Sequence, residues 1–443
     1  MKGLSKVGVR VSIIGAGSGQ FSLGIVRDLC LTRSLWGSTV SFMDIDAERL
    51  TAIHNVATRY VAEMGADLHF EQTLDRRTSL ESADFVVNTA MVDGWARFSA
   101  MDELTRAHGY PLGLWLDNHY QYRLFMDIVR DMEAVCPEAW YIQSANPVFE
   151  GCTLITRNSR IKAVGLCHGF HGGTRRIAQT LGLDPDQVQA QAYGINHFIW
   201  LTHFRYGGRD AYPLLDAWIE EGAQDHWARC LPSDDMGPKA VDVYRRLGLF
   251  PVGDTVTPGG GSFFRWYHAD RVTEERWRED PQGWMQRHIR HVDATVREFQ
   301  RVAGDPQASV AEAFPPVPTH ETNVSIIDAL ANDRPAVFQV NIPNRGSIPG
   351  IADDVVVEIP ALVSGAGIQG LRLDPLPTRI MCHLQEMIAN MERDLEAFVT
   401  GDRQMLLELV LANPHTRTLD QAQSVLDAVL VSPMNRDMAD HYR

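Results

Sequence analysis

Hydrophobic residues in the first part of the chain gather in short runs, each followed by a polar or glycine-rich turn. The run from Val9 to Ile14 leads into a turn with two glycines and then into a stretch with helical spacing of its apolar residues. Further strands are predicted at 40–43, 84–87 and 140–143. The order of strand, glycine turn and helix predicts an α/β fold with an N-terminal, doubly wound parallel sheet of the Rossmann type.

The second part of the chain has long amphipathic stretches and two neighbouring β-branched runs. Helical spacing is found at 212–221, 286–302 and 380–399, and more helix is expected as far as Leu430. The runs at 336–340 and 354–358 predict an antiparallel pair of strands joined by a long turn. We therefore expect one domain over 1–170 and an α+β domain over 171–443.

The turn after the first strand contains Gly15, Gly17 and Ser18. Glycines at these positions allow a tight turn and a close approach of a pyrophosphate, which the free N–H groups at the start of the helix can bind. The third glycine of the usual GxGxxG pattern is absent, and Gln20 occupies its position. The turn is weak evidence by itself, but its place between a strand and a helix favours dinucleotide binding.

Asp44 follows the second predicted strand, where an acid binds the ribose hydroxyls of a dinucleotide. A carboxylate there repels the 2′-phosphate of NADP, so the sequence favours NAD as the cofactor. The alternative is that Asp44 only caps a helix that begins near Asp46. The small polar turn that starts at Asn88 is suited to pass beneath the ribose on the nicotinamide side.

Asn146 lies in the turn after the strand at 140–143 and precedes a proline, which holds it extended. Its amide can present both polar atoms to a ligand, and a simple Asn-Pro turn explains the sequence equally well. Ligands of such folds bind beyond the carboxyl ends of the strands. The residues expected around this crevice are Gly15, Asp44, Asn88, Asn146 and Cys167.

Two candidate metal ligands lie in the stretch 164–200. Cys167 and His168 stand where a short apolar run ends, and Asn196 and His197 open a second run. A thiolate and an imidazole are ligands for a polarising cation. The alternatives are that the cysteine is a small buried hydrophobe and the histidine a hydrogen-bonded core side chain. The spacing leaves both interpretations open.

Residues 249–261 combine a short apolar run, the acid Asp254 and three consecutive glycines. A glycine-rich loop beside a carboxylate, here Thr257–Gly261, is either a mobile lid or a solvent loop.

Composition excludes several classes of protein. The net charge is −15 and the basic residues are scattered, so no basic face for nucleic acid is expected. No apolar run reaches the roughly 18 residues of a membrane helix, and the N-terminus lacks the apolar core and cleavage site of a secretory signal. Six cysteines without paired spacing indicate reduced thiols. We expect a cytoplasmic protein in which Cys167 is available as a thiolate.

The ordered motifs of the chain are GAGS and MDID after the first two strands, then NTAM, ANP, CHG, the NH pair, GDT, and NIPN with DDVVVEIPAL. Over roughly residues 9 to 440 this set resembles the NAD- and Mn-dependent glycosidases of glycoside hydrolase family 4. The CHG form and the acid of GDT are most similar to the α-glucosidase branch. Two departures, Phe170 and a short segment at Tyr110–Tyr120, lie where sugar specificity would be set.

The resemblance implies an O-glycoside hydrolase that uses NAD and Mn. NAD would oxidise the sugar at C3, Asp254 would remove the C2 proton, and elimination, hydration and reduction would follow. Cys167 and His197 would hold the metal, and Asn146 would hold the hydroxyl that is oxidised. His168 would orient the leaving oxygen or a sugar hydroxyl, or would serve only in packing. We expect an α-glycoside as the small-molecule partner and a homodimer or homotetramer.

Other activities stay open from the sequence. Within the family, an α-glucosidase is expected first, and an α-galactosidase or an α-galacturonidase or α-glucuronidase is the alternative. An NAD-dependent 2-hydroxyacid dehydrogenase would share the domain plan of lactate and malate dehydrogenases, but the chain shows no ordered Asp-His pair with a carboxylate-binding arginine. A non-catalytic NAD-sensing protein is a third class.

Overall fold

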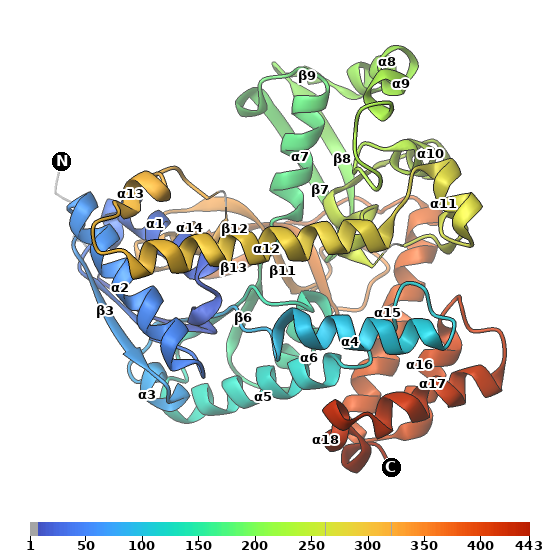
Figure 1. The fold of residues 1–443 in the computed structure, drawn as a ribbon. Helices are drawn as coiled ribbons and strands as arrows, with labels where there is room; N and C mark the ends of the chain where they lie inside the picture. Colours follow the sequence, from blue (N-terminus) through green and yellow to red (C-terminus); the bar gives the residue numbers. More distant parts are fainter. Residues whose placement is uncertain (1–7, 262, 320) are drawn as a thin grey trace.

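The structure is a computed structural model that describes residues 8–261, 263–319 and 321–443. Residues 1–7, part of the N-terminal stretch in which the sequence predicts no secretory signal, lie outside the described residues. In Figure 1 the blue and cyan N-terminal part lies beside the green, yellow and red remainder, and one sheet runs through both. Of the helices that the structure describes, none is both long and apolar enough to cross a membrane.

The described strands form one sheet in the order β10-β8-β7-β12-β11-β6-β5-β4-β1-β2-β3, with β13 beside β12 and β9 beside β8. Their bounds are β1 Arg10–Ile14, β2 Ser38–Met43, β3 Leu68–Thr73, β4 Phe85–Asn88, β5 Trp140–Gln143, β6 Lys162–Gly165, β7 Val188–Ile195, β8 Phe198–Tyr206, β9 Arg209–Asp210, β10 Phe250–Val252, β11 Ala336–Pro343, β12 Val356–Ser364 and β13 Gly367–Gly370.

The first six strands confirm the predicted Rossmann-type sheet. β6, β5, β4, β1, β2 and β3 are neighbours in that order, and every pair among them is parallel. This is the strand order of a dinucleotide-binding fold, in which ligands bind beyond the carboxyl ends of the strands. The apolar pattern missed β3, because this edge strand buries only Leu68 among its six residues.

The helices of the N-terminal part cover the two faces of the parallel strands, and those of the second part surround the antiparallel strands (Figure 1). Their bounds are α1 Gln20–Leu31, α2 Ala47–Met64, α3 Arg76–Leu80, α4 Gly94–Ala107, α5 Asn118–Val135, α6 Val148–Asn158, α7 Gly169–Thr180, α8 Tyr212–Glu221, α9 Ala223–Trp227, α10 Pro238–Leu247, α11 Arg271–Trp277, α12 Pro281–Gly304, α13 Val310–Ala313, α14 Asn323–Ala331, α15 Thr378–Thr400, α16 Arg403–Ala412, α17 Leu419–Val431 and α18 Arg436–His441. Short 3-10 turns are η1 Ala16–Ser18, η2 Arg33–Leu35, η3 Pro185–Gln187, η4 Gly253–Thr255, η5 Pro258–Gly260, η6 Arg265–Tyr267 and η7 Pro433–Asn435.

The predicted antiparallel pair is present as β11 and β12, and the pairing is longer than the β-branched runs suggested. Pro343 of β11 stands opposite Val356 of β12, so Asn341 belongs to the strand and not to the turn. The same Asn341 stands opposite Gly165 of β6, which joins the antiparallel strands to the parallel ones. The ends of β6 and β11 therefore lie side by side.

Helix α12 connects the second part of the chain back to the first. In Figure 1 it runs across the front of the molecule from α11 to α13. Arg59 of α2 donates hydrogen bonds to the carbonyl oxygens of Val302 and Asp305 at its C-terminal end, both at 3.0 Å. At its other end, α12 approaches the loop that contains η5. The helix thus spans from the Rossmann-type domain to the glycine-rich loop.

A buried ion pair holds together the segment between β9 and α12. Nζ of Lys239 lies 3.0 Å from Oε2 of Glu279, and both side chains are only 1% exposed. Ser233 donates a hydrogen bond to the same carboxylate, and His268 lies 3.2 Å from the lysine. Because these groups are buried away from solvent, each depends on the others for its polar contacts.

Replacing Lys239 by alanine would leave the carboxylate of Glu279 buried without its counter-ion. We expect Lys239→Ala to lower the free energy of unfolding by about 3–5 kcal/mol, measured by denaturant titration. Arg245→Ala is the control, because its pair with Glu220 is exposed and exposed pairs are worth at most about 1 kcal/mol. Equal losses in the two variants would contradict a special role for the buried pair.

Candidate active site

The turn between β1 and α1 is built from glycines at positions that no other residue could occupy without a shift. Gly15 has φ +84°, and a Cβ on it would stand 2.6 Å from Cα of Ala90 in the turn after β4. A Cβ on Gly17 would stand 2.7 Å from Oδ2 of Asp44. The turn therefore lies directly against the ends of β2 and β4, as predicted for a dinucleotide site.

The third glycine of this turn is Gly19, one position before the third glycine of the GxGxxG pattern. Gly19 has φ +67° and precedes α1, and a Cβ on it would stand 3.0 Å from the ring of Phe299 in α12. Beside it, the hydroxyl of Ser18 is buried without a hydrogen-bond partner among the described residues. An unpaired buried hydroxyl just before the N-terminus of a helix fits a site for a phosphate ligand.

Asp44 stands where the sequence placed it, at the end of β2. Its Oδ2 accepts a hydrogen bond from the N–H of Gly17 at 2.7 Å, and its Oδ1 accepts one from the N–H of Asp46 at 3.0 Å. The alternative that Asp44 caps α2 is wrong, because Asp46 is the capping residue and accepts from the N–H groups of Glu48 and Arg49. A carboxylate has further lone pairs, so Asp44 can still accept from ribose hydroxyls.

The two predicted asparagines differ in exposure. Asn88 is fully buried, and its amide contacts Tyr141 at 2.9 Å, Gln143 at 3.2 Å and the N–H of Ala90 at 3.1 Å. Its side chain therefore braces the end of β4 from inside, and a cofactor would meet the backbone of the turn instead. Asn146 has an exposed side chain, and its carbonyl oxygen accepts from Gln121 at 2.9 Å.

Three side chains from distant parts of the sequence meet at the end of β6. The Sγ of Cys167, a ring nitrogen of His197 and a carboxylate oxygen of Asp254 all lie within 4.8 Å of one another. Nε2 of His197 is 3.6 Å from Oδ2 of Asp254. Sulfur, imidazole nitrogen and carboxylate oxygen are a donor set that can hold a divalent metal ion. The structure thus brings together the two predicted metal ligands and places the predicted base beside them.

His197 reaches this point because of the hairpin between β7 and β8. Asn196 and His197 form its two-residue turn, and His197 has φ +62°, an uncommon conformation for a residue with a side chain. Nδ2 of Asn196 donates a hydrogen bond to Oε2 of Glu358 in β12 at 2.9 Å. This buried bond fixes the turn that presents the imidazole.

Glu358 is a site residue that the sequence reasoning missed. It is 1% exposed, and Gln339 also donates to its carboxylate, at 3.4 Å. A single acid in the middle of the apolar run of β12 was the available signal. Burial raises the pKa of Glu358 to about 7.

Asp254 is brought to the cysteine by contact between two glycine backbones. A Cβ on Gly173 of α7 would stand 2.5 Å from the backbone nitrogen of Gly253, and a Cβ on Gly253 would stand 2.4 Å from the carbonyl oxygen of Gly169. Any side chain at these positions would push η4 away from α7. The glycine of the GDT motif is therefore needed to place the next residue, Asp254, at the site.

The electrostatics of the site favour a cation. Burial, followed by the negative charges of Glu358 and Asp254, raises the pKa of the Cys167 thiol well above its usual value. Burial also lowers the pKa of His197, which keeps the ring neutral and able to bind a metal. Acidic groups crowded into a partly buried site repel one another when ionised, and a divalent ion relieves that repulsion. The residues present therefore fit the metal that the resemblance implies.

The two oxygens of Asp254 have different surroundings. Oδ1 accepts a hydrogen bond from the hydroxyl of Thr257 at 2.8 Å, and Oδ2 faces Cys167 and His197. The loop that follows, η5, folds back so that a Cβ on Gly259 would stand 2.7 Å from Oδ1. This part of the loop packs on the carboxylate, and whether it opens as a lid stays a prediction.

An aromatic cluster lies on the other side of Asp254 and was not found from the sequence. A Cβ on Gly259 would stand 2.7 Å from Oδ1 of Asp254 and 3.1 Å from the ring of Trp284 in α12, so the tryptophan lies close to the carboxylate. Trp284 stacks on His288 at 5.4 Å, and Trp95 of α4 meets the same histidine ring edge-on at 5.0 Å. The helical spacing read from the sequence begins at residue 286, after Trp284, so neither the helical position of this tryptophan nor its neighbours were inferred.

The short segment Tyr110–Tyr120, where sugar specificity was expected to be set, adds an exposed ring to this cluster. Trp115 has φ +55° and is 41% exposed, and its ring lies 5.1 Å from Phe98 of α4. Phe98 in turn contacts Trp95 at 5.5 Å. Large exposed aromatic side chains in a strained backbone are typical of ligand-binding surfaces.

His168 has an exposed side chain and directly precedes α7. Its charge lowers the pKa of His197 and of His288, in each case after the larger effect of burial. It also acts on Glu321, whose pKa burial raises. His168 is thus within electrostatic range of His197, His288 and Glu321.

Two family models match the chain. The model of family 4 glycosyl hydrolases matches residues 10–183, and that of the family 4 glycosyl hydrolase C-terminal domain matches residues 192–416. An α-glucosidase of Erwinia rhapontici is 26% identical, with 91% of this chain and 93% of the relative covered. An α-galactosidase of Bacillus subtilis (strain 168) is 24% identical with 92% and 93% covered, and a probable 6-phospho-β-glucosidase of that strain is 26% identical with 96% of each covered.

Solved structures share the fold. A 6-phospho-α-glucosidase from gut microorganisms, in complex with NAD and Mn²⁺, has a TM-score of 0.75 at 18% identity and covers 98% of this chain and 99% of its own. A lactate dehydrogenase from Eimeria maxima, with NADH and oxamate, has a TM-score of 0.53 at 12% identity, with 90% of this chain and 99% of its own covered. The expected relation to the fold of lactate dehydrogenases is confirmed. Because the family models together match most of its length, the chain belongs to glycosyl hydrolase family 4.

Proposed function

We propose that this chain hydrolyses the α-glycosides of an unphosphorylated sugar, an α-glucoside first, with NAD and a divalent metal ion as cofactors. The observation that carries the proposal is the meeting of Cys167, His197 and Asp254 within 4.8 Å. The relative solved with NAD and Mn²⁺ supports the choice of cofactors, since it shares the fold over nearly the whole chain. The α-glucosidase among the relatives supports the sugar.

When bound, NAD supplies a hydride acceptor for C3 of the sugar and returns the hydride later, and the divalent ion polarises the neighbouring sugar oxygens. Cys167 and His197 would hold the ion. Gly15, Gly17 and Asp44 would hold the dinucleotide, with Ser18 beside its phosphates. Their placement along the ends of β1, β2 and β6 supports this division, because both groups then lie at one edge of the sheet.

Asp254 acts as the base that removes the proton from C2. The hydrogen bond from Thr257 to Oδ1 fixes the carboxylate, and Oδ2, which lies on the side of Cys167 and His197, is the oxygen that takes that proton. The electron pair left at C2 forms a double bond between C1 and C2 as the bond between C1 and the glycosidic oxygen breaks, and the leaving oxygen takes up a proton from water. Water later adds across C1 and C2, with its oxygen on C1, and a proton returns to C2. His168 orients the leaving oxygen, and Asn146 holds the hydroxyl at C3.

The aromatic cluster supports a neutral sugar or aglycone at the site. Trp284 packs beside the proposed base. The exposed ring of Trp115 joins the same cluster through ring contacts with Phe98 and, beyond it, Trp95. Indole rings offer flat apolar surface on which a sugar ring can stack, with little loss of side-chain entropy. Phosphorylated sugars and hexuronides would instead need cationic groups at this place. Galactosides stay an alternative, because stacking does not distinguish them from glucosides.

A 2-hydroxyacid dehydrogenase is the alternative from another class. It would share the Rossmann-type domain, but a net oxidation would release NADH with every turnover. A glycosidase that returns its hydride accumulates none. Absorbance of NADH during turnover of nitrophenyl glycosides and of 2-hydroxy acids separates the two activities.

The proton taken by Asp254 makes the mechanism testable with heavy water. Reaction in D₂O should place deuterium at C2 of the released sugar, because the returning proton comes from solvent. Mass spectrometry of the product measures it. A displacement glycosidase leaves C2 unlabelled, so an unlabelled product together with a fully active Asp254→Asn variant would overturn the mechanism and the residue.

Asp254→Asn should lower kcat by about 10²–10⁴-fold if Asp254 is the base, while Mn²⁺ and NAD stay bound. Metal content measured on the same sample separates a base from a ligand, since a lost ligand would release the ion as well. Asp210→Asn, an exposed acid at the end of β9, is the control and should keep full activity.

Cys167→Ser should lose metal and activity together, because a thiolate that binds the ion is replaced by a hydroxyl. The wild-type chain should need added Mn²⁺ and a reducing agent, since Cys167 is only half-buried and must stay reduced to bind the ion. Cys382→Ser replaces an exposed thiol far from the site in sequence and is the control. Full Mn²⁺-dependent turnover of Cys167→Ser would remove this cysteine from the metal site.

NAD should bind more tightly than NADP, because Asp44 repels a 2′-phosphate. Asp44→Ser removes that repulsion and leaves Arg49 close to Gly17, so the preference should shift toward NADP by about tenfold or more, which is about 1.4 kcal/mol. Fluorescence titration of both dinucleotides measures the ratio. Equal affinities in the unmodified chain would refute the assignment of Asp44.

A further inference from the structure

A second group of side chains that could hold a metal ion begins at the end of α9 and continues into the loop that leads to α10. His226, Cys230 and Asp234 follow one another at intervals of four residues, and their ligand atoms all lie within 4.8 Å of one another. These residues share no ligand with the site at Cys167. We propose that this loop binds one zinc ion, which has a structural role.

The donor atoms suit zinc better than a hard cation. They are an imidazole nitrogen, a sulfur and a carboxylate oxygen, a set that zinc accepts in tetrahedral geometry, with water as a fourth ligand. Nε2 of His226 is 3.2 Å from Oδ1 of Asp234, close to the separation of two ligands on one ion. Cys230 completes the group from the turn between them. Binding would release the thiol proton to solvent.

The carboxylate of Asp234 is already oriented for this task. Its Oδ2 is 2.5 Å from Arg176 of α7, and its Oδ1 accepts from the N–H of Met236 at 2.9 Å while facing His226. Arg176 also lies 3.4 Å from Asp235, so its charge is balanced by two acids. Partners that hold the far side of a ligand are a common feature of metal sites.

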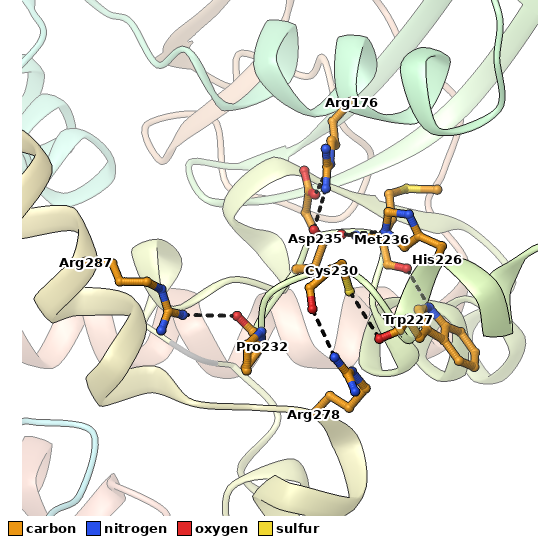
Figure 2. Close-up of polar contacts among 10 residues, drawn as sticks. Arg176, His226, Trp227, Cys230, Pro232, Asp235, Met236, Arg278 and Arg287 are labelled. Carbon is orange, nitrogen blue, oxygen red and sulfur yellow. Dashed lines mark hydrogen bonds and ion pairs between the residues drawn. The ribbon is translucent and has the colours of Figure 1, made fainter.

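Arginine side chains from three segments hold the loop by hydrogen bonds and ion pairs, as Figure 2 shows. Arg176 reaches it from α7, Arg278 donates to the carbonyl oxygen of Cys230 at 3.0 Å, and Arg287 of α12 donates to that of Pro232 at 3.3 Å. The indole N–H of Trp227 closes the loop through the carbonyl oxygen of Met236 at 2.9 Å. The ligand positions are thus held by the backbone before any ion binds.

An ion pair between His226 and Asp234 explains the positions of these two side chains but not the presence of Cys230 beside them. The thiol of Cys230 makes a long contact, 3.9 Å to the carbonyl oxygen of Trp227, lies near Arg278, and stays within reach of both other ligands. A zinc ion would join all three. Because Arg176 and Arg287 connect the loop to α7 and α12, the ion would stiffen the support of Cys167 and Trp284 without touching substrate.

The experiment uses the full chain in a Cys167→Ser background, so that zinc cannot bind at the proposed active site through that thiolate. After zinc loading and gel filtration, metal analysis should find about one zinc per chain in this background and less than about 0.1 after the further change Cys230→Ser. Cys382→Ser in the same background is the matched control and should keep its zinc. Zinc should also raise the Tm of the first variant and not that of the Cys230→Ser variant.

Cobalt substitution tests whether a thiolate binds the ion even if the Cys230→Ser variant fails to fold. Co²⁺ bound in the Cys167→Ser chain should show the intense absorption of a cobalt–thiolate bond and the visible bands of tetrahedral cobalt, and His226→Gln should weaken both. Zinc that stays bound after Cys230→Ser overturns the proposal. So does a Cys167→Ser chain that retains no zinc or shows no cobalt–thiolate band.

Discussion

The contact between the backbones of α7 and η4 is the constraint on which the site depends. Gly173 meets Gly253 and Gly253 meets Gly169 so closely that no side chain fits between them. This contact sets Asp254 beside Cys167, although the two are far apart in sequence. A side chain at either glycine would have to separate the two segments, so Cys167, His197 and Asp254 would no longer share one site.

The same closeness concentrates negative charge. Cys167, Asp254 and Glu358 approach one another in a partly buried place, and the pKa values of Cys167 and Glu358 are raised, mainly by burial. Neutral donors organise these acids: the amide of Asn196 binds Glu358, and the hydroxyl of Thr257 binds Asp254. A divalent cation held at Cys167, His197 and Asp254 would offset this crowding of acidic groups.

The site lies where the parallel and the antiparallel parts of the sheet meet. β6 ends the parallel part and stands next to β11, while β7 and β8 carry the hairpin that presents His197. Helix α12 brings Trp284 and His288 to the same place and anchors its other end on Arg59 of α2. A dinucleotide bound by the first domain and a sugar bound by the second would therefore meet at the end of β6.

The sequence by itself determined the elements whose signals are local. Apolar runs predicted β1, β2, β4 and β5, helical spacing predicted α8, α12 and α15, and polar turns after strands singled out Asp44, Cys167 and His197. It did not find Glu358, Trp284 or Gly19, and it left open whether Cys167 and His197 meet. Those relations join residues that are distant along the chain, through glycine contacts and a hairpin that periodicity does not encode. Only the tertiary structure could decide them, because proximity is set by how the elements pack and not by the spacing of residues within each one.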